Sequence, residues 1–181
     1  MTDNKKPSLQ QDSMRYGTLM GIFWTLKFIL FPLGMNTPAL LVGFFLLSFI
    51  GVPVLGYRFA LQYRNHECQG TISWSRAFLF TAFMYFFAAL FTTIAHYIYF
   101  YYLDNGLIVS TYQNMLSQMT DIANTDEMKT SLEQLQQALD IISGLTPLEI
   151  SIQLLMQNIF YCTMLAIPTA LLVKKEKNIR E

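Results

Sequence analysis

Charged side chains are scarce in this chain of 181 residues: Asp, Glu, Lys and Arg make up 13% of it, whereas 53% of its residues are hydrophobic. That balance lies outside the usual range of soluble domains. The formal net charge is zero, and the sequence contains neither a basic domain nor an acidic block. We therefore predict that the protein does not bind nucleic acid.

Cysteines and catalytic motifs are also sparse. The two cysteines, Cys68 and Cys162, predict no disulfide framework and show no metal-ligand spacing. The sequence has no HExxH, GxSxG, Walker or CxxC motif, and no pair of intramembrane aspartates, so metal, acyl and phosphate chemistry lack their usual residues. We predict a protein that is not an enzyme and that has no catalytic residue, cofactor or metal site.

What the sequence does contain is long stretches without any Asp, Glu, Lys or Arg, and residues 77–103 form one of them. As a helix it would be about 40 Å long, more than the roughly 30 Å of the hydrocarbon core of a bilayer. It predicts a transmembrane helix that is tilted or projects at one end.

Three further apolar runs predict spans at residues 14–31, 39–57 and 147–173. A cleaved signal peptide is the alternative for the first run, but no small-x-small site follows it and Lys27 interrupts it near its end, so we favour a retained anchor that Ser13 caps. Pro53 predicts a kink in the second run. Thr146, Pro147 and Glu149 predict a capping box at the start of the last one.

Residues 105–145 form the only sizeable piece outside these spans. They predict a hairpin of two amphipathic helices, separated at Asn124 and Thr125 and ended by Gly144. The second helix carries a narrow apolar seam at alternating steps of four and three, which consists of Met128, Leu132, Leu135, Leu139 and Ile142. The hairpin could close on itself, lie on the membrane surface, or use the seam to bind a partner.

The distribution of basic residues predicts the orientation. Ten of the twelve Lys and Arg residues fall in the N-terminal tail and the start of the first span, in the loop between the second and third spans, and in the C-terminal tail; only Lys27 and Lys129 lie elsewhere. The 105–145 piece and Asp104 before it carry six acids. By the positive-inside rule both termini are cytoplasmic and the hairpin is extracytoplasmic. The prediction is an all-α, multi-pass protein of one domain, residues 1–181, in the inner membrane.

The passage GTISWSRAF leads into the third span, which ends in IYFYYLDNG. This passage, with its Gly70, Ile72, Ser73, Trp74, Ala77 and Phe78, resembles a family of bacterial four-helix membrane proteins catalogued as domain of unknown function 4199 and seen chiefly in Bacteroidota. The resemblance covers nearly the whole chain and implies an integral inner-membrane protein without catalytic residues to transfer. Ser73 or Ser75 could cap the third span.

Polar residues inside the spans are the candidate functional residues, because ionisable groups are costly in lipid. The third span has a stripe at steps of three or four, which consists of Thr81, Tyr85, Ala88, Thr92, His96 and Tyr99. The fourth span has a polar row at steps of four, which consists of Glu149, Gln153 and Gln157. The intramembrane candidates are Lys27, Tyr85, His96, Glu149, Gln153 and Gln157. Lys27 and Glu149 could form an ion pair, or could respectively extend to the headgroups and cap a helix.

If the two polar rows face each other, they form a hydrogen-bonded seam that either fastens the helices or carries protons or a small solute. Two functions therefore stay open. One is a non-enzymatic interaction component of the cell envelope, which binds another envelope protein. The other is a small transporter or channel subunit, which would act as a homo-oligomer in the lipid bilayer because four helices are few for a transporter.

Overall fold

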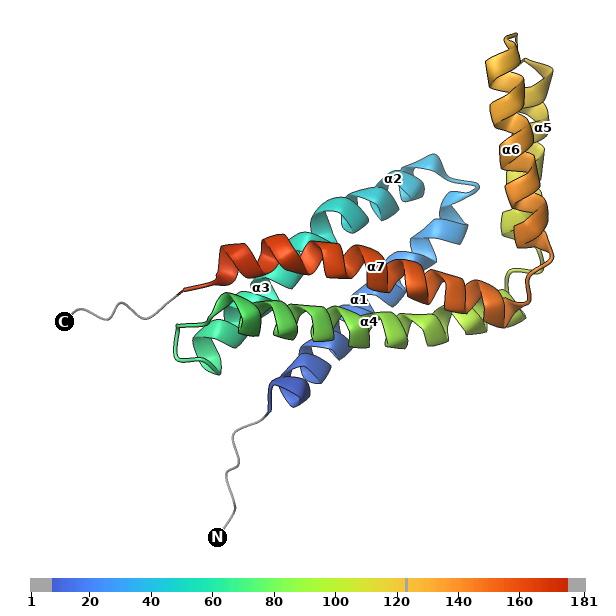
Figure 1. Cartoon of the computed structure of the whole chain (residues 1–181). Coiled ribbons are helices and arrows are strands. Elements are labelled where there is room, and N and C mark those ends of the chain that lie inside the picture. The colour runs from blue at the N-terminus through green and yellow to red at the C-terminus, as the bar shows by residue number, and fades with distance from the viewer. Residues whose placement is uncertain (1–7, 123, 176–181) are drawn as a thin grey trace. The chain divides into compact units, whose positions relative to one another are not determined.

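The computed structural model describes residues 8–122 and 124–175, which are helical apart from short turns and one isolated bridge (Figure 1). The elements are α1 Leu9–Gly34, α2 Pro38–Leu46, the π-helix η1 Leu47–Gly51, α3 Val52–His66, α4 Trp74–Tyr102, α5 Leu107–Asp121, α6 Asp126–Ser143 and α7 Pro147–Val173. Four runs are long and apolar enough to cross a membrane, namely α1, the continuous Pro38–His66, α4 and α7. The predicted all-α protein with four membrane spans is confirmed.

The chain divides into two compact units. The first consists of the described residues of Met1–Thr93 and Leu155–Glu181, and so holds α1, the second span, the beginning of α4 and the end of α7. The second is Ile94–Leu154, with the end of α4, α5, α6 and the start of α7. The single domain expected from the sequence stays a prediction.

The first span begins earlier than predicted. The Ser8 hydroxyl accepts from the Gln11 backbone N–H at 3.3 Å, and the Gln11 side chain accepts from the Ser8 backbone N–H at 3.1 Å, which makes a reciprocal capping box. Ser13 is not the cap. It is fully buried inside α1, where its hydroxyl donates to the Phe80 carbonyl at 3.3 Å. The prediction for Ser13 was wrong because the Ser8 box already satisfies free N–H groups at the helix start; residues 1–7 lie outside the described residues.

The ends of the first two spans also extend beyond the predicted boundaries. Helix α1 continues through Pro32 to Gly34, and the second span runs to His66 because Arg58 and the residues after it prolong the helix beyond its apolar part. The π-helix ends at Gly51, two residues before Pro53. Proline lacks an N–H and its ring crowds the carbonyl one turn earlier, so the helical ladder opens at this point.

The first unit is held together by close backbone contacts between α1, α3 and α4. A Cβ placed on Gly17 would lie 2.7 Å from the Met84 carbonyl oxygen, and one on Gly21 would lie 2.8 Å from the Phe91 Cβ. A Cβ on Gly56 would overlap the Tyr85 hydroxyl. These glycines let the helices approach closely enough to pack backbone on side chain, as small residues do in membrane bundles.

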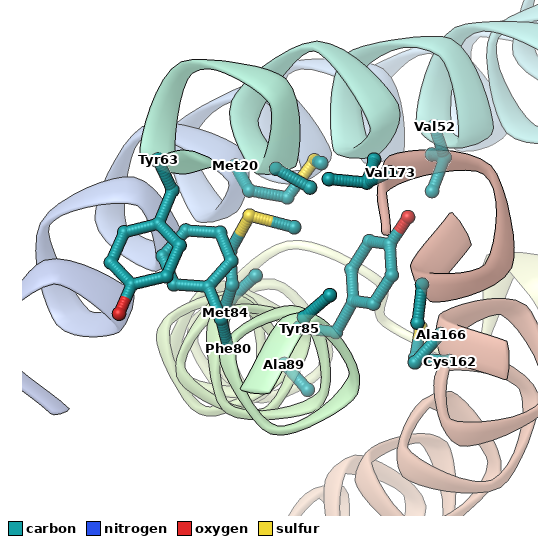
Figure 2. Close-up of a cluster of buried hydrophobic side chains, with 14 of the residues drawn as sticks. Met20, Val52, Tyr63, Phe80, Met84, Tyr85, Ala89, Cys162, Ala166 and Val173 are labelled. Atoms are coloured by element: carbon teal, nitrogen blue, oxygen red, sulfur yellow. The ribbon is translucent and has the colours of Figure 1, made fainter. Parts of the chain in front are cut away.

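The core between these helices is aromatic at one end. Tyr63 of α3 and Phe80 of α4 stack face to face with ring centroids 3.9 Å apart (Figure 2). Tyr16 of α1 meets the Phe80 ring edge-on. The Arg76 Nε donates to the Tyr63 hydroxyl at 3.2 Å. Buried aromatic pairs of this kind add to the energy of burial alone.

Three basic segments meet at that same end of the first unit. Arg64 of α3 donates to the Val173 carbonyl at the end of α7, at 3.1 Å. Ile72, in the turn before α4, forms an isolated antiparallel bridge with Lys175, with N–H to O distances of 2.9 and 3.0 Å. Arg64 of α3 therefore caps the last carbonyl of α7, and the turn before α4 pairs with the residues that follow α7. Ser73 caps α4 by accepting from the Arg76 N–H at 3.4 Å.

In the second unit α5 and α6 pack on each other, and local signals define their ends. The Asp104 carboxylate accepts from the N–H groups of Gly106 and Ile108 and from the Tyr99 hydroxyl, which starts α5. Thr125 caps α6 by accepting from the Met128 N–H at 3.3 Å, and Gly144 is its C-cap. The predicted break, cap and stop are confirmed, whereas the extracytoplasmic side of this pair stays a prediction.

Candidate functional site

The first candidate is a cation in the membrane-spanning part. Lys27, on α1, forms no ion pair with any described carboxylate of the first unit; instead its ammonium lies 5.2 Å from the ring centre of Phe44 and 5.8 Å from that of Trp24. The negative faces of aromatic rings attract a cation, and the attraction grows where water is excluded. Lys27 is therefore held between the first and second spans without a counter-charge in that unit.

Three buried polar atoms in the first unit, on Trp24, Thr25 and Tyr85, have no hydrogen-bond partner among the described residues. Trp24 is 4% exposed and Tyr85 is 1% exposed, and their rings are nearly parallel with centroids 6.0 Å apart. The three atoms are the Trp24 indole nitrogen, the Tyr85 hydroxyl oxygen and the Thr25 hydroxyl oxygen. The Thr169 hydroxyl lies near Tyr85 but donates to the Leu165 carbonyl at 2.9 Å.

This arrangement has a definite chemical character. A lysine, an indole N–H and a phenol hydroxyl are all hydrogen-bond donors, and the set contains no carboxylate. Leaving such groups unsatisfied in a buried site costs free energy. Trp24 links the other two residues, since it lies beside the Lys27 ammonium and its ring stacks on that of Tyr85. The cluster of Lys27, Trp24 and Tyr85, which we call the donor cluster, could thus hold a hydrogen-bond acceptor. Sequence reasoning found Lys27 and Tyr85 but missed Trp24, although it lies within one helical turn of Lys27.

The threonines of the α4 stripe are satisfied by their own helix. Thr81 donates to the Ala77 carbonyl and Thr92 to the Ala88 carbonyl, each at 2.8 Å, and both threonines are buried. His96, further along α4 in the second unit, is also buried. The stripe is therefore an inward-facing surface of α4 whose threonines need no partner on another helix.

The polar row of α7 lies in different surroundings. Glu149 is exposed, and its carboxylate accepts from the Thr146 backbone N–H at 2.8 Å and from the Thr146 hydroxyl at 2.7 Å, which confirms the predicted capping box. Gln153 and Gln157 are exposed as well. Within the first unit Tyr85 faces inward and Gln157 outward, and within the second unit the same holds for His96 and Gln153, so neither unit brings the two rows face to face. Pairing of Lys27 with Glu149 stays a prediction.

The predicted seam of α6 is split by its packing on α5. Leu132 and Leu139 are buried, whereas Leu135 is 53% exposed and Met128 and Ile142 are exposed to a similar degree. Met128, Leu135 and Ile142 recur every seven residues and form one line along α6, which we call the outer stripe. The α5–α6 pair thus closes on itself with two leucines and leaves the other three apolar side chains unpacked.

A small apolar groove lies between α4 and α7 in the first unit. Its volume is about 230 Å³, and it is lined by Ala82, Phe83, Phe86, Ile159, Cys162 and Thr163. The Thr163 hydroxyl donates to the Ile159 carbonyl of its own helix at 2.8 Å, so the groove offers little polar chemistry. Among the described residues, no group of three or more His, Cys, Asp and Glu side chains could hold a metal ion.

Comparison with known proteins identifies the family. The family model described as "Protein of unknown function (DUF4199)" matches residues 15–175. The chain belongs to this family. The match covers all four spans and the α5–α6 pair, so the resemblance drawn from the sequence is confirmed. No curated protein and no solved structure matches the chain.

Proposed function

We propose that this multi-pass membrane protein is a non-enzymatic interaction component of the cell envelope. The observation that carries the proposal is the outer stripe of α6, a line of apolar side chains left unpacked by α5. Such a line at seven-residue spacing fits the apolar face of a partner helix. Asp126, Glu133 and Asp140 are exposed on the same helix, so a partner with basic residues beside its apolar face would complement it.

We further propose that the protein lies in the inner membrane with both termini in the cytoplasm. The convergence of α3, the start of α4 and the end of α7 at one end of the first unit supports this, because these segments carry most of the described basic residues, namely Arg58, Arg64, Arg76, Lys174 and Lys175. Asp104 and the acids of α5 and α6 then belong to the opposite, outer side.

Crosslinking in the native host followed by purification in mild detergent tests the interaction. The informative variant replaces Met128, Leu135 and Ile142 with serine, which removes the outer stripe without touching the two buried leucines. Replacing the exposed Gln137 with serine is the matched control. We expect a stoichiometric partner that the triple variant loses and the control keeps; a crosslinked partner unaffected by the triple variant, or no partner at all, would refute the proposal.

The donor cluster favours a second candidate function, a subunit of a small transporter or channel. A partly buried lysine without a counter-charge in its unit is a candidate for passage or binding of an anion or polar solute. Proteoliposomes containing the protein, the Lys27→Met variant or the His96→Ala variant test it. Flux of protons or small ions that either variant abolishes would support this function, and no flux in any of the three would exclude it.

A further inference from the structure

The two glutamines of α7, Gln153 and Gln157, lie one helical turn apart on its exposed side. Ala166, nine residues after Gln157, points in the opposite direction at about 100° per residue and is fully buried in the core of the first unit. Neither glutamine side chain forms a hydrogen bond with any described residue. Gln157 therefore lies near the centre of the face that α7 turns away from its own bundle.

The depth of Gln157 makes its exposure costly. It follows Pro147 by ten residues, about 15 Å along a helix that is about 40 Å long. With α7 centred in a hydrocarbon core of about 30 Å, Gln157 lies roughly 10 Å inside the hydrocarbon. An amide that reaches lipid there loses its hydrogen bonds to water and gains none in return. A partner that supplies both a donor and an acceptor at this depth would relieve the penalty.

We propose that this face of α7 is an interface between two copies of the chain. Copies with the same orientation in a membrane are related by a two-fold axis along the membrane normal, which keeps every residue at its own depth. The Gln157 side chain of one copy then lies opposite the Gln157 side chain of the other. Because one amide carries both donors and an acceptor, two such side chains satisfy each other, whereas a different partner would need a matching polar group at the same depth.

The residues around the glutamines suit such a contact. Phe160, Tyr161 and Met164 follow on the same side of α7 and are each more than half exposed. They supply apolar packing surface on either side of the amide pair, and interhelical packing and hydrogen bonds together drive association in lipid. The interface uses only α7, so it is independent of the outer stripe proposed to bind another protein.

Cysteine crosslinking in native membranes tests the geometry. The background carries Cys68→Ser and Cys162→Ala, and single cysteines replace Gln153, Gln157 or Met156. Met156 is the matched control, because it is also exposed and lies at nearly the same depth but points about 100° away from Gln157. We expect disulfide-linked dimers for Gln157→Cys and Gln153→Cys and few for Met156→Cys. Equal crosslinking at all three positions, or none at Gln157, would overturn the proposal.

A second measurement does not depend on added cysteines. In lipid nanodiscs or by single-molecule counting in vesicles, we expect Gln157→Leu to raise the dimer dissociation constant about ten-fold, and Gln157→Asn to retain most of the affinity. A monomer at all accessible concentrations would overturn the proposal. So would a photocrosslinker at position 157 that captures another membrane protein rather than a second copy. The variant with serine at positions 128, 135 and 142 should lose the partner of α6 and still form the α7 dimer. The two proposals can therefore fail independently of each other.

Discussion

Two rows of polar side chains run along membrane-spanning helices of this protein, and they meet their hydrogen-bonding needs differently. On α4, Thr81 and Thr92 are buried and donate to carbonyls of their own helix. On α7, Gln153 and Gln157 are exposed and have no side-chain hydrogen bond among the described residues. A threonine hydroxyl reaches the carbonyl one turn earlier, whereas a longer amide with two donors and an acceptor needs a group from outside its helix.

The comparison separates a packing surface from an interaction surface. The threonines of the α4 stripe can be buried against an apolar neighbour, because their hydroxyls are already hydrogen-bonded to carbonyls of α4. The role of this surface is to pack closely against α1 and α3. The glutamine side chains of α7 form no hydrogen bond with the described residues of their own chain. Four substitutions sharpen this contrast.

The largest effect is expected where α1 meets the packing surface of α4. Gly17→Val would force a side chain against the Met84 carbonyl, and we expect a loss of about 3 kcal/mol in unfolding free energy, at the upper end for overpacked sites. Gly43→Val is the matched control, because a Cβ there meets nothing within 4 Å. Unfolding in mixed micelles measures both. Equal losses for the two variants would show that the α1–α4 contact is not the tight one.

Tyr85→Phe tests the donor cluster beside the same surface. It removes a buried hydroxyl without a partner and keeps the stacked ring, so stability should stay level or rise by about 1 kcal/mol. The same unfolding measurement applies. A clear loss of stability would mean that the hydroxyl is bonded in the membrane, for instance to a bound solute or ordered water.

Thr92→Val tests whether the threonines of α4 fasten one helix to another. The Thr92 hydroxyl donates within α4, so its removal should break no bond between helices. We therefore expect a loss of unfolding free energy no greater than about 0.6 kcal/mol, which is the average for a polar contact between membrane helices. Repeating the substitution at Thr81 serves as a replicate. A loss of several kcal/mol at either position would identify an interhelical bond.

The smallest effect is expected at Gln157. The Gln157 side chain is exposed and forms no hydrogen bond with a described residue. Gln157→Leu should therefore change the unfolding free energy of the monomer by less than about 0.5 kcal/mol. Measurement at a high detergent-to-protein ratio keeps the chain monomeric. A large change would place Gln157 inside the bundle rather than on its outer face.

Local signals were enough to predict much of the fold. The Thr146–Glu149 box and Pro147 lie next to one another in sequence, and the predicted fourth span of 147–173 agrees with α7. Thr125 and Gly144 bound α6 as expected for the same reason. The long uncharged stretches define the other spans, although their ends moved where polar helix continued into water.

The orientation of each helix about its own axis could not be predicted in the same way. Steps of three and four show that residues share a face, but which neighbour covers that face depends on helices distant in sequence. Gln157 and Tyr85 were therefore assigned to one seam, and the structure places them on outward and inward faces. The Gly17–Gly21 pair, four residues apart, is the signal that could have predicted the contact of α1 with α4.

The bond from Arg64 to the Val173 carbonyl joins residues 109 positions apart. During synthesis the first three spans leave the ribosome before Val173 exists, so Arg64 of α3 and Ile72 in the turn before α4 find their backbone partners only after the last span has been made. Final closure of the bundle is thus tied to the completion of translation.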